Sequence, residues 1–331
     1  MVDAALDLSR ASRRLLSELD DDGVVIDAEG PILALILDEL GYARRPPRFE
    51  RRTPVYGSII VPGDRSLVTA GDLADLIPLD DQPLDVARRY ADGRASFLVL
   101  EPDGRRSLAL FRRSVQYEAD LIQIQADTGV YIVQRTPVLH ATRLFTSTRT
   151  IEWSGYRWTA RATAAAQQRK LDPHLPPIPR PVVGGLLELA LHWLSPSRVG
   201  ATFVVPVDGV RDGLDIERAV DAPELSVVHR HHYPALLAAL TQTDLATLVD
   251  HRGAIHHLGV GLRWSLEAEA AVAIEDKGMR HRSAARWTYD HPDALAVVVS
   301  EDGPVSVFRQ GRALTKCVGA LQVELPEATA S

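Results

Sequence analysis

The first half of the chain changes its hydrophobic pattern once. Apolar residues recur at helical spacing in LDLSRASRRLLSELD and PILALILDELGYA, which predicts helices within residues 1–45. From Val55 to about Arg161, short apolar runs alternate with turn residues. SFLVLEPDGRRSLALF predicts a hairpin about Pro102–Gly104, LIQIQADTGVYIVQ predicts a second hairpin, and TRTIEWSGYRWTAR predicts a third. We therefore predict an α+β domain over residues 1–165, beginning with the helical segment.

A proline-rich segment separates this region from the second half. QRKLDPHLPPIPRP contains five prolines. Proline lacks an N–H group and clashes with the preceding helical turn, so a continuous helix is excluded here. We predict a semi-stiff, extended linker over residues 166–180 and place the domain boundary there.

The second half, residues 181–325, has a more regular pattern. Helical spacing in VVGGLLELALHWLS, HYPALLAALTQ and RHRSAARWTYDH alternates with strand-like runs in VGATFVVPV, ATLVDHRGAIHHLGVGL and ALAVVVSEDGPVSVFRQG. The last two runs contain turns at Asp250–Gly253 and Glu301–Gly303, so each predicts a hairpin. The order helix, strand, helix, hairpin, helix, hairpin predicts an α/β domain with a mixed sheet flanked by helices.

Composition narrows the function classes. The chain has 331 residues, a net charge of -7 and one cysteine, Cys317. A chain with a net negative charge gives no strong indication of non-specific binding to DNA or RNA, so any site for an anion must be a local cluster of basic residues. One cysteine excludes an intramolecular disulfide framework and a cysteine-rich zinc site. With no signal-peptide core and no apolar run near the ~20 residues of a membrane span, we expect a cytoplasmic protein.

A cluster of two arginines about a histidine begins a predicted helix in GMRHRSAARW, Gly278–Trp287. Such a cluster can be a solvated helix start. Here small residues, Gly278 and Ser283, flank it and would let a ligand approach the backbone. A helix N-terminus favours phosphate, and arginines add bidentate contacts. The pattern indicates a polyphosphate site that is neither a Walker A loop nor a dinucleotide fingerprint.

These residues resemble the diadenylate cyclase family, the domain at the N-terminus of the DNA-integrity scanning protein. The family's Gly-Thr-Arg-His-Arg motif matches Gly278–Arg282, with Met279 in place of threonine. Its Asp-Gly-Ala motif is placed at Asp244–Ala246, with Leu245 in place of glycine. The alternative register at DHRGA puts Arg252 where the aspartate belongs. The resemblance covers roughly residues 181–323.

The resemblance implies that two ATP molecules condense to cyclic di-AMP and two pyrophosphates. It requires two cyclase domains face to face, and so a homodimer or higher homo-oligomer. It implies a divalent cation, Mg²⁺ or Mn²⁺, held by Asp244 with Glu301. The implied catalytic residues are Asp244, Arg280, His281 and Arg282, and the implied nucleotide-contacting residues are Leu245, Ala246, Leu262, Gly278, Met279, Ser283, Ser300 and Glu301.

Two rival hypotheses remain for the second half. A non-catalytic relative would bind ATP or cyclic di-AMP without making it, and a structural dimerisation protein would keep the fold alone. We expect an ordinary extended backbone at Leu245, because it leads into the β-rich ATLV. An active but slow cyclase follows from that expectation.

The remaining features are interpreted more simply. The first half is compatible with a sensor domain for an unidentified ligand, or with a scaffold that positions the cyclase domain. The histidines of VVHRHHYP and His256–His257 favour an exposed loop and a half-buried strand over a metal site. The basic segment RRPPRFERR favours a solvated connector over an anion site.

Overall fold

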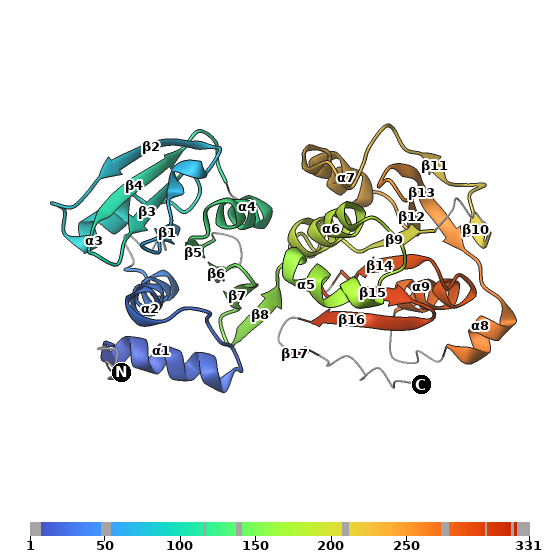
Figure 1. Cartoon of the computed structure of the whole chain (residues 1–331), viewed down its shortest axis with the longest axis horizontal. Coiled ribbons are helices and arrows are strands. Elements are labelled where there is room, and N and C mark those ends of the chain that lie inside the picture. The colour runs from blue at the N-terminus through green and yellow to red at the C-terminus, as the bar shows by residue number, and fades with distance from the viewer. Residues whose placement is uncertain are drawn as a thin grey trace. The chain divides into compact units, whose positions relative to one another are not determined.

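Each half of the chain builds its own sheet with its own flanking helices (Figure 1). The computed structural model describes residues 8–47, 54–115, 117–136, 141–206, 212–272, 278–301, 303–318 and 321–322. The chain divides into two units, Met1–Arg161 and Ala162–Ser331. The α+β and α/β classes predicted for the two halves are confirmed.

The first unit is an eight-stranded sheet with helices on both faces. Its strand order is β2-β4-β3-β1-β5-β6-β7-β8, and β1 and β3 are parallel. The strands are β1 (Tyr56–Ile60), β2 (Leu73–Pro78), β3 (Ser96–Leu100), β4 (Arg106–Phe111), β5 (Tyr131–Arg135), β6 (Thr142–Phe145), β7 (Arg149–Trp153) and β8 (Trp158–Ala162). The helices are α1 (Arg10–Asp21), α2 (Gly30–Arg44), α3 (Leu84–Ala87) and α4 (Glu118–Thr128), with 3-10 turns η1 (Leu67–Thr69) and η2 (Arg88–Tyr90).

Neighbouring residues of the central strands supply two separate cores. Ile60 and Leu98 pack with α1 and α2 on one face, whereas Ile59 and Phe97 pack with α4 on the other. Successive side chains of a strand point to opposite faces, so a sheet covered on both sides needs apolar residues at consecutive positions. The uninterrupted apolar runs of β1 and β3 meet this requirement.

One predicted hairpin is wrong. LIQIQADTGVYIVQ contains most of helix α4 followed by strand β5, rather than two strands. The alternation of LIQIQ fits a strand, but Leu121 and Ile124 are three positions apart and both enter the core beside Ile132. Glu118 and Asp120 lie in the first turn, where the helix dipole favours acids, and Gly129 ends the helix in a left-handed conformation.

The second unit has a nine-stranded mixed sheet. The order is β10-β13-β12-β9-β14-β15-β16-β17, β11 also pairs with β13, and β9 and β12 are parallel. The strands are β9 (Ala201–Val205), β10 (Leu214–Asp215), β11 (Val220–Asp221), β12 (Ala246–Val249), β13 (Ile255–Leu262), β14 (Leu295–Val299), β15 (Val305–Arg309), β16 (Arg312–Val318) and β17 (Leu321–Gln322). The helices are α5 (Ala164–Leu171), α6 (Arg180–Leu189), α7 (Tyr233–Leu240), α8 (Leu266–Ala271) and α9 (Met279–Asp290), with short helical segments η3 (Asp172–His174), η4 (Ala190–Leu194) and η5 (Arg230–His232).

Helices cover both faces of this sheet. Phe203 and Val297 pack with α6 and α7 on one face, whereas Val204 and Val298 pack with α9 on the other. Every helix, strand and hairpin predicted from residue 181 to residue 311 is present in the predicted order, and the structure adds the short helix α8 before α9. The sheet also extends beyond the predicted strands, through β10, β11, β16 and β17.

The predicted extended linker is wrong in its first part. The division between the units falls at Arg161–Ala162, and α5 then begins at Ala164 with Thr163 as its N-cap. Leu171 and Ile178 are buried in the core of the second unit. The prolines begin at Pro173, after α5 has ended, so they do not prevent that helix from forming. Buried apolar contacts hold the segment against its unit.

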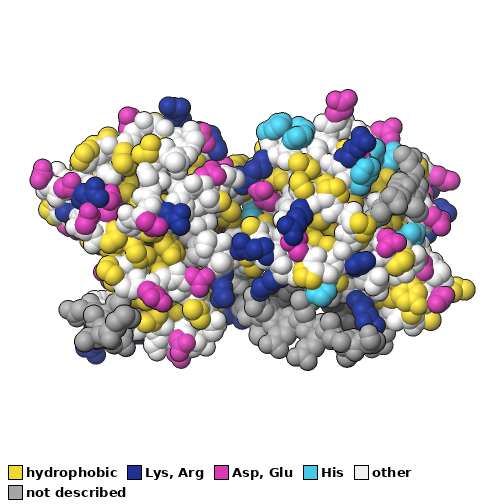
Figure 2. All heavy atoms as spheres, viewed as in Figure 1, with side chains coloured by type: hydrophobic (Ala, Val, Ile, Leu, Met, Phe, Trp, Pro, Cys, Tyr) yellow, Lys and Arg dark blue, Asp and Glu magenta, His cyan; other side chains and the backbone are white. Residues whose placement is uncertain are grey.

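Within the described ranges, the helices are too short or too polar for any of them to span a membrane. Basic and acidic side chains are interspersed on the face of each unit shown in Figure 2. That mixture agrees with the absence of a bulk basic field in the sequence.

Candidate functional site

A pocket of about 720 Å³ lies where the start of α9 faces the ends of several strands of the second unit. The segment before β12 contributes Asp244 and Leu245, and the segment after β14 contributes Ser300 and Glu301. The whole lining comprises Thr202, Asp244, Leu245, Ala246, Val260, Gly261, Leu262, Trp264, Gly278, Met279, Arg280, His281, Ser283, Ser300, Glu301 and Pro304. Every site residue expected from the sequence therefore lies in this lining, except Arg282.

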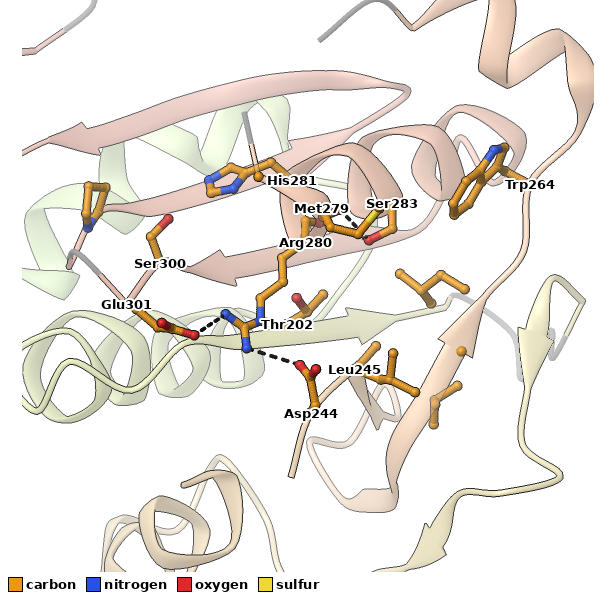
Figure 3. A pocket seen from close by; sticks show the side chains of 16 residues that line it. Thr202, Asp244, Leu245, Trp264, Met279, Arg280, His281, Ser283, Ser300 and Glu301 are labelled. Carbon is orange, nitrogen blue, oxygen red and sulfur yellow. Dashed lines mark hydrogen bonds and ion pairs between the residues drawn. The ribbon is translucent and has the colours of Figure 1, made fainter. Parts of the chain in front are cut away.

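Arg280 is the electrostatic centre of the pocket. Its Nη2 donates to Oδ1 of Asp244 at 3.1 Å, and its Nη1 donates to Oε1 of Glu301 at 2.9 Å. Figure 3 shows the guanidinium between the two carboxylates, which approach it from separate segments. Both carboxylates are exposed, at 79% for Asp244 and 70% for Glu301. An exposed pair of this kind contributes little to stability and is easily exchanged for a ligand.

The surroundings favour the charged forms of these groups. The backbone N–H of Leu245, and then the Arg280 guanidinium, lower the pKa of Asp244 below its usual value. The hydrogen bond to Glu301 raises the pKa of Arg280, although burial opposes that shift. The pocket therefore presents an ionised carboxylate and a permanent cation at neutral pH.

Leu245 has a left-handed backbone, with φ of 68°. The expectation of an extended backbone at this position is therefore wrong. Among non-glycine residues that the structure describes, a positive φ also occurs at Arg198 and Gln310. An L-residue in this conformation costs about 1–2 kcal/mol, since its Cβ crowds the carbonyl oxygen. The turn nonetheless directs the Leu245 N–H to the Asp244 carboxylate.

The other residues of the arginine–histidine motif differ in position. His281 is buried, with Nε2 3.3 Å from Oγ of Ser306 and its ring edge-on to Phe308. This arrangement anchors the first turn of α9 to β15. Ser283 Oγ lies 3.0 Å from the carbonyl oxygen of Met279, within the helix. Arg282 is absent from the pocket lining, and its buried Nε has no hydrogen-bond partner among the described residues.

Sequence reasoning missed Thr202, on β9. Thr202 is 2% exposed and lines the pocket, and its Oγ1 has no hydrogen-bond partner in the described part of the chain. Its neighbours across the sheet are Ala246 and Val298. A buried hydroxyl without a partner is costly, so it marks a position where a ligand could supply the bond. The signal was a threonine inside the apolar strand ATFVV.

Gly200 and Trp264 were also missed. A Cβ at Gly200 would lie 2.5 Å from Nη1 of Arg280 and 3.0 Å from Cγ of Glu301, so the glycine leaves room for that ion pair. Trp264 gives the pocket a planar wall, and the Arg286 guanidinium lies 5.4 Å from the centroid of its ring. An indole face of this kind can stack on a nucleobase.

The carboxylates of Asp244 and Glu301 suit a divalent cation that is coordinated by the phosphates of a substrate as well. No cluster of three or more His, Cys, Asp or Glu suited to a metal occurs in the ranges that the structure describes. Mg²⁺ commonly takes one or two protein carboxylates and completes its shell with substrate phosphates and water. Asp244 and Glu301 match that donor set. In the histidine cluster of η5, Nδ1 of His232 already accepts a hydrogen bond from the Ser226 N–H.

Comparison with known proteins assigns each unit to a different model. Residues 188–313 match the family model DAC, described as DisA bacterial checkpoint controller nucleotide-binding. Residues 14–161 match the model described as Probable sensor domain DACNK. No curated protein matches the chain.

Two solved structures are similar to this chain at low identity. One is a hypothetical membrane spanning protein from Bacillus cereus, with 21% identity and a TM-score of 0.36, covering 49% of this chain and 72% of that chain. The other is a double mutant of DacA from Staphylococcus aureus, with 19% identity and a TM-score of 0.33, covering 42% of this chain and 87% of that chain.

Proposed function

Since the second unit is a DAC domain of the DisA nucleotide-binding family and the first is a DACNK-type sensor domain, we propose that the chain is a diadenylate cyclase. It condenses two ATP molecules into cyclic di-AMP and two pyrophosphates. The observation that carries the proposal is the Asp244–Arg280–Glu301 arrangement in the pocket at the start of α9. We place this activity in the cytoplasm.

The size of the pocket supports one nucleotide per domain. A volume of about 720 Å³ falls within the range of about 300–1,000 Å³ that is typical of small-molecule sites. In the reaction, each 3′-hydroxyl oxygen attacks the α-phosphorus of the other ATP. The bond from that phosphorus to the bridging oxygen breaks, pyrophosphate leaves, and the hydroxyl proton is lost. Two such pockets must face each other, which a two-fold homodimer provides.

The residues of the pocket have different roles in binding the substrate. Arg280 and the free N–H groups of the first turn of α9 bind the triphosphate. His281 positions that turn through its contacts with Ser306 and Phe308. Asp244 and Glu301 would hold the divalent cation, which neutralises phosphate charge and helps to activate the attacking hydroxyl.

Arg280 exchanges partners when the substrate binds. In the structure its guanidinium occupies the space between Asp244 and Glu301. A triphosphate with its cation offers the arginine stronger acceptors and offers the carboxylates a divalent ion. The two ion pairs therefore keep both carboxylates oriented until the substrate replaces the arginine.

The direct test is product formation by the full chain. Purified protein is incubated with ATP and Mg²⁺ or Mn²⁺, and cyclic di-AMP is measured by mass spectrometry. The matched control is Asp244→Asn, which removes the negative charge at nearly constant shape. Since the side chain of Asp244 is 79% exposed, we expect the variant to fold normally and to make no product. Parent-level synthesis by this variant would contradict the role of Asp244.

A nucleotide-binding protein without cyclase activity is the second candidate. It is favoured by Leu245, whose side chain lines the pocket where the family motif has a side-chain-free glycine. Calorimetry with ATP and with cyclic di-AMP separates the two functions. Binding of either nucleotide with no product under any metal condition would favour the second candidate, whereas product formation excludes it.

A further inference from the structure

We propose that the N-terminal unit binds a small organic anion in a pocket of about 820 Å³ between α1, α2 and the α3–η2 turn. We call this the arginine pocket. It is lined by Arg10, Ala11, Ser12, Arg14, Leu15, Glu18, Leu37, Asp38, Gly41, Tyr42, Arg44, Arg45, Leu84 and Arg88. All of these residues belong to the first unit, so the inference does not depend on what the second unit catalyses.

The charge of the lining favours an anion. Five arginines face the pocket against two carboxylates, Glu18 and Asp38. Arg10 and Arg45 are exposed, and neither forms an ion pair with another residue in the described ranges. Asp38 already accepts a hydrogen bond of 2.6 Å from Ser12. Two guanidiniums are thus available to a ligand without breaking an ion pair within the described part of the chain.

Two further arginines are held in place beforehand. Arg44 pairs with Glu18, and its guanidinium lies 4.8 Å from the centroid of the Trp153 ring. Arg88 pairs with the buried Glu39 at 2.5 Å and lies 4.3 Å from the centroid of the Tyr42 ring. A guanidinium has five donors, so a single carboxylate leaves several of them unused. Because these side chains are already ordered, binding costs less conformational entropy.

Leu84 and Tyr42 give the pocket its apolar surface. Leu84 is 36% exposed and Tyr42 is partly exposed, whereas Leu15 and Leu37, which also line the pocket, are buried at 4% and 1% exposure. The ring of Tyr42 is fixed edge-on against Tyr56, with centroids 4.8 Å apart. A bare phosphate ion would leave these surfaces unused. The arrangement instead suits a molecule with an apolar or aromatic body and a phosphate or carboxylate group.

The first experiment measures binding to the full chain by isothermal titration calorimetry. The probes are phenyl phosphate and isophthalate, which separate the phosphate source from the carboxylate source. Phenol tests the apolar body alone, and inorganic phosphate tests the anion alone. We expect saturable binding of at least one aromatic anion, at least tenfold tighter than phenol and inorganic phosphate. If neither aromatic anion binds, or if phenol or inorganic phosphate binds equally well, the proposal fails.

The second experiment locates the binding. The double variant Arg10→Gln/Arg45→Gln changes two exposed side chains, and Arg13→Gln is the matched control on the same helix, exposed but outside the lining. We expect affinity for the aromatic anion to fall at least tenfold in the double variant and to stay within twofold in the control. An unchanged affinity in the double variant would place the binding elsewhere, such as the pocket of the second unit, and would overturn the proposal.

Discussion

Replacing Leu245 with glycine tests how the turn before β12 limits the pocket. Leu245 has φ of 68° and is 58% exposed. Glycine removes a left-handed strain of about 1–2 kcal/mol. It adds a backbone entropy cost of about 0.5–1 kcal/mol. It also loses the partly buried side chain, which contributes about 1 kcal/mol, since full burial of a leucine contributes about 1.5–3 kcal/mol. These contributions nearly cancel, so Leu245→Gly should change the free energy of unfolding by less than about 1 kcal/mol.

Leu245→Ala is the matched control, because it removes the isobutyl group but keeps Cβ and the strain. We expect the alanine variant to be less stable than the glycine variant by about 1 kcal/mol. For a unit of this size, that difference corresponds to about 2–4 °C in melting temperature. Thermal unfolding of the three proteins, followed by circular dichroism, measures it. An alanine variant as stable as the glycine variant would show that the backbone here is not left-handed.

The same variants separate steric from backbone effects on the nucleotide. We expect Leu245→Gly to tighten ATP binding or to raise the rate of cyclic di-AMP formation, measured at matched metal concentration. If the isobutyl group obstructs the pocket, alanine should give most of this gain. If the backbone conformation is limiting, glycine alone should give it. A glycine variant with unchanged affinity and rate would refute the view that Leu245 limits nucleotide binding or cyclic di-AMP formation.

Three further predictions follow from the structure. Arg280→Ala should weaken ATP binding at least tenfold in calorimetry, and Arg282→Ala should weaken it less, because Arg282 is absent from the pocket lining; equal losses would contradict this. Thr202→Val should raise the melting temperature by removing an unpartnered buried hydroxyl, yet weaken ATP binding; a change of either quantity in the other direction would contradict the ligand role. Burial raises the pKa of Asp92, but hydrogen bonds from the N–H groups of Ser96, Arg94 and Ala95 outweigh burial and lower the pKa overall. The ionised carboxylate therefore stabilises the folded state above the pKa of the unfolded chain, about 4, and this stabilisation is lost as the pH falls through the lower pKa of the folded state. Urea unfolding should therefore show Asp92→Asn to be less stable than the parent at neutral pH, with the difference shrinking in acid; a pH-independent difference would exclude this explanation.

The candidate site was named from the sequence because two short motifs, Asp244–Ala246 and Gly278–Arg282, resemble those of the diadenylate cyclase family. Only the cluster at the start of α9 also followed from the residues themselves, since arginines at a helix N-terminus favour phosphate. The sequence did not predict which residues these motifs contact in the folded protein. Arg280 pairs with partners 36 and 21 positions away in the chain, and nothing in either local pattern specifies those pairs. The partnerless hydroxyl of Thr202 likewise depends on strands that close around it.

The sequence by itself determined most helices and strands of the second unit, because each apolar run there has one clear period. It did not determine α4, because two patterns overlap there. The apolar and polar residues of LIQIQ alternate as in a strand, whereas Leu121 and Ile124 are spaced as on one face of a helix. Packing against Ile132 and Phe145 decided that case. Tertiary structure also decided the left-handed backbone of Leu245, because an L-residue keeps a strained backbone only where the surrounding structure holds it, and Arg280, which pairs with the adjacent Asp244, lies 36 positions away in the chain.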